Sequence, residues 1–161
     1  MVRRSGSAAA LGLVGIAGLH LMWGLGSSVP FRSRADLADS VVGCPQMPGP
    51  AACQLVAVSL LGAGALTVDL PVFPPRARRI GRAVVATTLI ARGVIGLAGR
   101  TDLVSPASTS PKFRRLDRAV YAPLCLALGA AVATAVRAHP TAQKSRLDIR
   151  RSAAGGQQTQ R

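Results

Sequence analysis

Arg92 is the residue whose type and setting most clearly suggest chemistry. It lies in the stretch LIARGVIGL (89–97), in which every other residue is aliphatic or glycine. An arginine at the centre of a membrane span costs about 2.5–3.5 kcal/mol on insertion scales, which roughly cancels the contribution of the apolar residues around it. We therefore expect Arg92 to face other helices or a wet cavity. There it would either form a ligand or proton site, or extend outward and clamp backbone carbonyls.

His20 is a second candidate, inside an uncharged run near the N-terminus. Helical spacing places it on the face that also carries Ile16 and Trp23, where an imidazole could titrate or hydrogen-bond to a neighbouring helix. A metal site is not expected, because no second histidine or acid lies nearby in the sequence to complete a ligand set.

Asp117, Tyr121, Cys125 and Gly129 recur every four residues and therefore form a single stripe on a helix. The stripe either lines a site or combines three ordinary features: an acidic first turn, an interfacial tyrosine and a small core residue.

These candidates are expected to lie at similar depth. Helical rise puts His20, Arg92 and Cys125 roughly 10–13 Å below the same ends of their helices, and Tyr121 about 5 Å below. The sequence thus predicts an outward-opening pocket suited to a polar or anionic headgroup, lined by His20, Arg92, Asp117, Tyr121 and Cys125. The alternative is a polar clasp between three helices, with no ligand.

Cys44 and Cys53 are candidates for a disulfide, because both fall on the predicted outer side with three prolines between them. Closing so short a loop adds on the order of 2–3 kcal/mol of stability. The absence of a CxxC pair argues against a thiol redox relay. The sequence also lacks the P-loop, GxSxG, HExxH and GxGxxG motifs, so an ordinary hydrolase or nucleotide enzyme is not expected and the cofactor stays unknown.

Four apolar segments must position these residues. Residues 5–31, 40–68 and 119–136 carry no charge, and residues 83–99 are broken only by Arg92. A hydrocarbon core of about 30 Å needs about 20 such residues in a helix. The sequence therefore predicts an all-α, four-helix transmembrane bundle within residues 1–138. The expected spans are 8–29, 51–70, 80–99 and 119–138, followed by a basic, disordered tail over 139–161.

The net charge of +14 is distributed around the apolar segments and does not form one basic stripe. Aromatic residues for stacking bases are also scarce, so nucleic acid is excluded as a partner and the lipid bilayer is the expected one. With both termini inside, twelve basic residues lie on the cytoplasmic side and seven outside, which predicts an N-in, C-in protein of the inner (plasma) membrane. Asp69, at the cytoplasmic end of the second span, is expected to pair with the arginines of 76–82.

Small residues at helical spacing predict close helix packing in lipid. The rows are Gly12, Gly15 and Gly18 in the first span, Gly93, Gly96 and Gly99 in the third, and Gly129 and Ala133 in the fourth.

Several stretches of the sequence are similar to a known family: GLHLMWGLGSSVPF (18–31), GPAACQLVAVSLLGAGAL (49–66), LIARGVIGL (89–97) and SPKFRRLDRAVYAPLCLALGA (110–130). The chain resembles a bacterial family of small four-span membrane proteins classified only as a domain of unknown function. The family's pattern falls on His20, Trp23, Arg92, Gly93, Phe113, Asp117, Tyr121, Pro123 and Cys125. The resemblance implies an integral membrane protein and supplies no activity, substrate or cofactor.

Three function classes follow from these observations. The first is binding of a small polar or anionic ligand in the outward-facing pocket. The second is an accessory subunit whose glycine rows dock another membrane protein. The third, a membrane redox or lipid-modifying enzyme, needs a reactive group that the sequence does not show, so a role other than catalysis is favoured.

Overall fold

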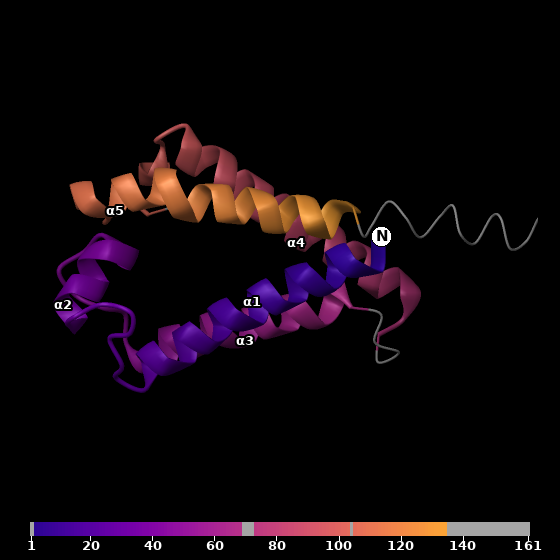
Figure 1. Cartoon of the computed structure of the whole chain (residues 1–161), viewed down its shortest axis with the longest axis horizontal. Helices are drawn as coiled ribbons and strands as arrows, with labels where there is room; N and C mark the ends of the chain where they lie inside the picture. The colour runs from indigo at the N-terminus through magenta and orange to yellow at the C-terminus, as the bar shows by residue number, and fades with distance from the viewer. Residues whose placement is uncertain (1, 69–72, 104, 135–161) are drawn as a thin grey trace, which may run out of the picture.

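The computed structural model describes residues 2–68, 73–103 and 105–134, and this part of the chain is helical and contains no strand (Figure 1). The long helices are α1 (Val2–Gly24), α3 (Pro50–Thr67), α4 (Pro75–Leu97) and a fourth helix, Pro111–Thr134. All four are long and apolar enough to cross a membrane, which confirms the all-α fold with four candidate spans.

The fourth helix is not uniform. It begins as α5 (Pro111–Leu116), continues as the π-helical segment η3 (Asp117–Tyr121) and returns to α-helix over 122–134. A serine cap explains its start, because the Ser110 side chain accepts a hydrogen bond from the Phe113 N–H and Pro111 takes the first position.

The ends of the helices differ from those of the expected spans. α1 ends at Gly24, before the expected Val29, and Gly26 turns the chain with a φ of 100° that favours glycine. α4 and the fourth helix begin before the expected spans, because a proline starts each of them. The expected spans left out the basic first turns of both helices. The end of the second expected span, together with Asp69, and the tail over 139–161 lie outside the described residues.

The long helices form two pairs. α1 packs against α3, and α4 runs beside the fourth helix (Figure 1). The pairs meet near the N-terminus, where Ala9, Ala86 and Val132 form a small buried cluster, and they separate toward the other end. We call that other end, which holds residues 25–49 and 98–110, the capped end.

A short helical segment lies between the two pairs at the capped end: α2 (Arg34–Leu37) followed by the π-helical η1 (Ala38–Val42) (Figure 1). On one side Leu37 packs with Trp23 and Cys53 of the first pair. On the other side Asp36 forms an ion pair with Lys112 at the start of the fourth helix. This segment, residues 34–42, therefore links the two helix pairs, and we call it the capping segment.

The close packing predicted for the glycine rows is confirmed at Gly93 of α4 and Gly129 of the fourth helix, which form a seam between these two helices. A Cβ on Gly93 would lie 2.8 Å from the Ala122 carbonyl oxygen, and one on Gly129 would lie 3.2 Å from that of Ala86. The expected row on α1 does not form a seam within this bundle at Gly15 and Gly18, because nothing lies within 4 Å of a Cβ at either position.

Large apolar side chains are exposed on the outer faces of the helices. Leu11 of α1 is 73% exposed, Leu55 of α3 69% and Val84 of α4 59%. Such faces are unfavourable in water and favourable against lipid. Together with the four helices of spanning length, they indicate a multi-pass membrane protein.

Candidate functional site

The centre of the candidate site is an ion pair between α4 and the fourth helix. Arg92 Nη2 lies 2.5 Å from Asp117 Oδ1, and Nη1 donates to Oδ2 over 3.3 Å. This bidentate geometry is the strong form of an arginine–carboxylate interaction. It joins the helices where the glycine seam brings them together.

Gly96 makes room for this ion pair. It follows Arg92 by one helical turn, so a side chain there would stand in the path of the guanidinium. A Cβ on Gly96 would lie 2.8 Å from Arg92 Nη1 and 3.0 Å from Asp117 Oδ2. The long arginine side chain can therefore run along α4 toward the capped end and reach the carboxylate.

Thr101 completes the coordination of Asp117. It lies in the short helix η2 (Thr101–Leu103), and its hydroxyl donates to Asp117 Oδ2 over 2.8 Å. The turn that places it there begins at Gly99, which has a φ of 71°. Asp117 is fully buried, and these three hydrogen bonds are what a buried carboxylate requires. Thr101 was not among the residues predicted from the sequence, although a threonine two residues after Gly99, which turns the chain beyond α4, was a usable signal.

Tyr121 is tied to the capping segment. Its hydroxyl donates to the Ser40 carbonyl of η1 over 3.1 Å, and no bond to Arg92 forms. The Ser40 hydroxyl is buried and has no hydrogen-bond partner among the described residues.

The π-helical turn explains why Asp117 and Tyr121 do not share one partner. The Ala122 N–H donates to the Asp117 carbonyl, five residues back, so a turn here contains more residues than an α-helical turn. Residues four apart then no longer stack directly above each other. Asp117 consequently faces Arg92 while Tyr121 faces η1.

Cys125 and His20 differ in how they relate to the ion pair. Cys125 is a half-buried free thiol on which the charges of Arg92 and Asp117 both act. His20 Nδ1 lies 2.9 Å from the Ile16 carbonyl, and its ring centre lies 4.8 Å from that of Trp23, so these contacts stay on α1.

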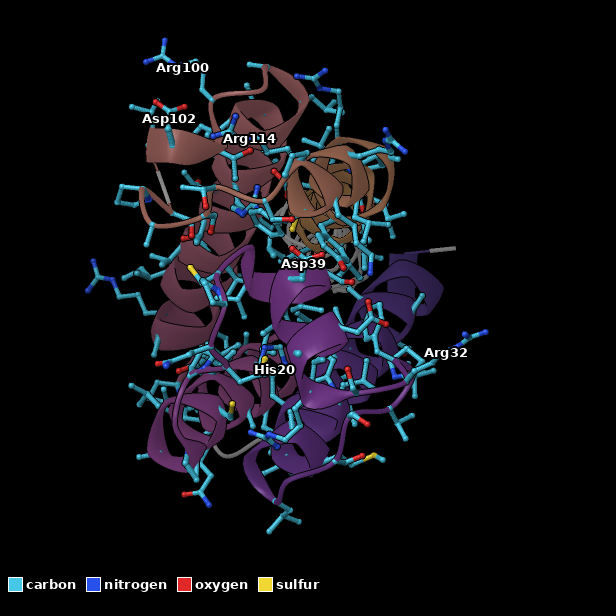
Figure 2. All side chains as sticks on the ribbon, turned by 90° about the vertical axis from the view of Figure 1, so that its left-hand side faces the viewer. His20, Arg32, Asp39, Arg100, Asp102 and Arg114 are labelled. Carbon is cyan, nitrogen blue, oxygen red and sulfur yellow. The ribbon has the colours of Figure 1, made fainter. Side chains whose placement is uncertain are left out.

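The view from the capped end shows the same division (Figure 2). His20 lies on the side of α1 and α3, whereas Arg100, Asp102 and Arg114 lie on the side of α4 and α5. Within the described residues, no group of three or more histidines, cysteines or acids could hold a metal ion.

Cys44 and Cys53 are both free thiols in the structure, so the candidate disulfide is not formed there. Cys44 Sγ donates to the Ala107 carbonyl over 3.0 Å, whereas Cys53 Sγ lies 3.9 Å from the Pro48 carbonyl. The first contact belongs to the connection between the helix pairs and the second to the start of α3, so the two thiols serve different contacts.

Arg82 differs from the exposed arginines Arg76 and Arg79 at the start of α4. It is buried between α3 and α4, and its Nε donates to the Leu66 carbonyl over 2.7 Å. Leu66 lies in the last turn of α3, where helix carbonyls lack a donor from their own helix. The preceding Gly81 allows the close approach, since a Cβ there would lie 2.8 Å from the Leu66 side chain.

The comparisons with known proteins agree with this fold. The family described as "Protein of unknown function (DUF3995)" matches residues 13–132, a range that holds the ion pair and the capping segment. No curated protein and no solved structure matches the chain. Because the match covers well over half of the sequence, the chain belongs to the DUF3995 family.

Proposed function

We propose that this DUF3995 protein binds a small polar or anionic molecule at the exposed side of the Arg92 guanidinium. One observation carries the proposal: the Arg92 side chain is 27% exposed, whereas that of its partner Asp117 is 0% exposed. A guanidinium has more N–H donors than two carboxylate oxygens satisfy. In the described part of the chain both acceptors of Arg92 belong to Asp117, so donors remain on the exposed side.

The chemistry of the pair favours the class of ligand. A guanidinium matches the planar, two-oxygen edge of carboxylates and phosphates. Asp117 offsets the positive charge, so the ligand is a polar molecule or a weakly charged anion held by hydrogen bonds. Cys125 follows Asp117 by about two helical turns on the fourth helix, so its thiol can serve as a reporter of binding.

We further propose that the protein lies in the inner (plasma) membrane with both termini in the cytoplasm. With both termini in the cytoplasm, the twelve basic residues on the inner side outnumber the seven outside, as bacterial inner-membrane proteins favour. The capped end then faces outward and the Arg92 site opens toward it. An alkaline phosphatase fusion at the C-terminus should be inactive, and an active fusion would overturn the orientation.

The test of binding must separate loss of the ligand from loss of the fold. Arg92→Leu leaves a buried carboxylate without its cation and so disturbs the bundle itself. The double variant Arg92→Met with Asp117→Asn removes both charges and should keep the bundle folded. Mass spectrometry of small molecules retained after mild solubilisation should show a species with the wild type that the folded double variant lacks.

Cys125 provides the second measurement. In a background with Cys44→Ser and Cys53→Ser, alkylation of Cys125 should be slow while the retained molecule is bound and faster after it is removed. If the folded double variant retains the same molecules and shows the same alkylation rate, the ion pair is a clasp between helices and the binding proposal fails.

A second candidate function is that of an accessory subunit, favoured by the open row on α1. Gly15 and Gly18 have nothing within 4 Å of a Cβ, so another membrane helix could approach there closely. Gly15→Leu would then abolish co-purification of a partner in mild detergent while leaving ligand retention unchanged.

A further inference from the structure

We propose that the start of α4 binds the headgroup of an anionic phospholipid through Arg76 and Arg79. This surface lies at the opposite end of α4 from the Arg92 site, and the inference does not depend on the proposed function. Both side chains are exposed, and neither has a hydrogen bond or ion pair to another described residue.

The start of α4 carries more positive charge than its own segment of the sequence balances. Residues 75–82 carry Arg76, Arg78, Arg79 and Arg82, and they contain no acid. The nearest acid in the sequence, Asp69, lies outside the described residues, and one carboxylate could neutralise only one of the four arginines. An excess of positive charge therefore remains, and anionic lipid supplies the complementary charge at this depth.

An apolar stripe continues directly from the arginines along the lipid-facing side. Ile80 and Val84 follow Arg76 by one and two helical turns, so the three residues share a face. Ile80 is 61% exposed and Val84 59% exposed. Arg76 lies about 6 Å beyond Ile80 along the helix axis. This offset would place the arginine at the lipid headgroup while Ile80 and Val84 contact the acyl chain.

The equivalent arginines at the capped end lack this arrangement. Arg114 and Arg115 are also exposed and also stand near the start of a helix. One turn further along, however, Arg114 is followed by Arg118, another exposed cation. The fourth helix also exposes Val120 and Leu124 further along, so the two ends differ in where the apolar row begins: it starts one turn after Arg76, whereas another cation stands one turn after Arg114.

The experiment uses the full chain and phosphatidylglycerol, with phosphatidylcholine as the neutral reference. Native mass spectrometry of the protein released from mixed micelles measures retention of each lipid. The wild type should retain phosphatidylglycerol preferentially, and Arg76→Gln with Arg79→Gln should weaken this retention by about tenfold to thirtyfold. The matched control, Arg114→Gln with Arg115→Gln, removes the same charge and should stay near the wild type.

Two further arms identify the source of binding. Ile80→Gln keeps both arginines but interrupts the stripe, and it should also weaken retention of phosphatidylglycerol. Competition with inorganic phosphate or glycerol phosphate should not displace the lipid at equal concentration. Equal losses for the two arginine pairs, or displacement by the soluble anions, would overturn the proposal. Loss of ligand retention in the Arg92 variants should leave all of these results unchanged.

Discussion

Arg82 and Arg92 are both arginines of α4 that turn toward a neighbouring helix, yet they have different partners. Arg82 is buried and donates to the Leu66 backbone carbonyl at the end of α3. Arg92 is partly exposed and forms an ion pair with the buried Asp117 of the fourth helix. Arg82 therefore donates to a backbone carbonyl at a helix end, and Arg92 donates to a carboxylate.

The part of the neighbouring helix that each arginine meets explains the difference. Near the end of a span, the last carbonyls of a neighbouring helix are free to accept hydrogen bonds. Arg92 instead meets the first turns of the fourth helix, where the Phe113, Arg114 and Asp117 carbonyls already accept hydrogen bonds within the helix, so a side chain must supply the acceptor. The contrast predicts that the two sites will respond differently when the arginine is removed.

The largest effect is expected for Arg92→Leu. It leaves the fully buried Asp117 without its cation and should lower the free energy of unfolding by about 3–5 kcal/mol. Thermal unfolding in mild detergent measures the loss. Asp117→Ala should cost less, because the partly exposed Arg92 can still extend toward the headgroups.

The control for this prediction is Arg92→Leu combined with Asp117→Leu. It removes both charges and should restore most of the stability lost in Arg92→Leu. A double variant that is less stable than either single variant would show that the two residues act independently.

The next effect is expected for Arg82→Met, which leaves the Leu66 carbonyl without this donor. It should lower the free energy of unfolding by about 1.5–3 kcal/mol, less than Arg92→Leu. The same unfolding measurement compares the two directly. If Arg82→Met lowers the free energy of unfolding more than Arg92→Leu, the buried carboxylate of Asp117 is not what makes the Arg92 site the more sensitive one.

A smaller effect is expected for Gly96→Ala, which places a methyl group against Ala122 and the ion pair. The cost should be about 1–3 kcal/mol, toward the lower end, since the Arg92 side chain can shift. Gly15→Ala on α1 meets nothing within 4 Å and should be neutral or slightly stabilising. Equal effects of the two alanines would contradict the seam between α4 and the fourth helix.

The smallest effect concerns the ion pair that links the capping segment to the fourth helix. The hydrogen bond from Lys112 holds the pKa of Asp36 below its ordinary value. The lowered pKa contributes stability at pH values above the pKa of the unfolded chain, and this contribution is lost as the pH falls through the folded value. Asp36→Asn should remove this acid-side dependence, seen as a smaller drop in melting temperature between neutral and acidic pH, while a drop equal to that of the wild type would exclude Asp36 as its source.

The sequence was sufficient to predict the four long helices, but not the short helical segments between them or all of the contacts. Uncharged runs predicted the four helices, because hydrophobic length alone decides which segments can span a membrane. The single arginine within an apolar run, Arg92, was also predicted to face other helices or a wet cavity. The π-helical turn was not predictable from a four-residue spacing, and it separates Tyr121 from Asp117.

Arg82 shows a second limit of sequence reasoning. In the sequence it is one of several basic residues at the start of a span, which predicts a headgroup location. Its burial depends on the close approach of Gly81 to Leu66, a contact between helices that no local pattern reports. The contacts of His20 contrast with this, because Ile16 and Trp23 lie on α1 itself and helical spacing alone places them on its face.

The most direct measurement of the central claim is crosslinking of positions 92 and 117 in native membranes. Arg92→Cys with Asp117→Cys, in a background without Cys44, Cys53 and Cys125, removes both charges together and should keep the bundle folded. A short bifunctional thiol reagent should join the two positions, and trypsin, which cleaves after Arg100 between them, makes the joined peptides visible by mass spectrometry. A matched control pairs Arg92→Cys with Val120→Cys, a 48% exposed position on the fourth helix, and carries Asp117→Asn.

We expect efficient crosslinking between cysteines at positions 92 and 117 and little crosslinking between those at 92 and 120. Efficient bridging to 120, or free reaction of position 92 with a lipid-phase thiol reagent without a bridge to 117, would contradict the pairing of Arg92 with Asp117.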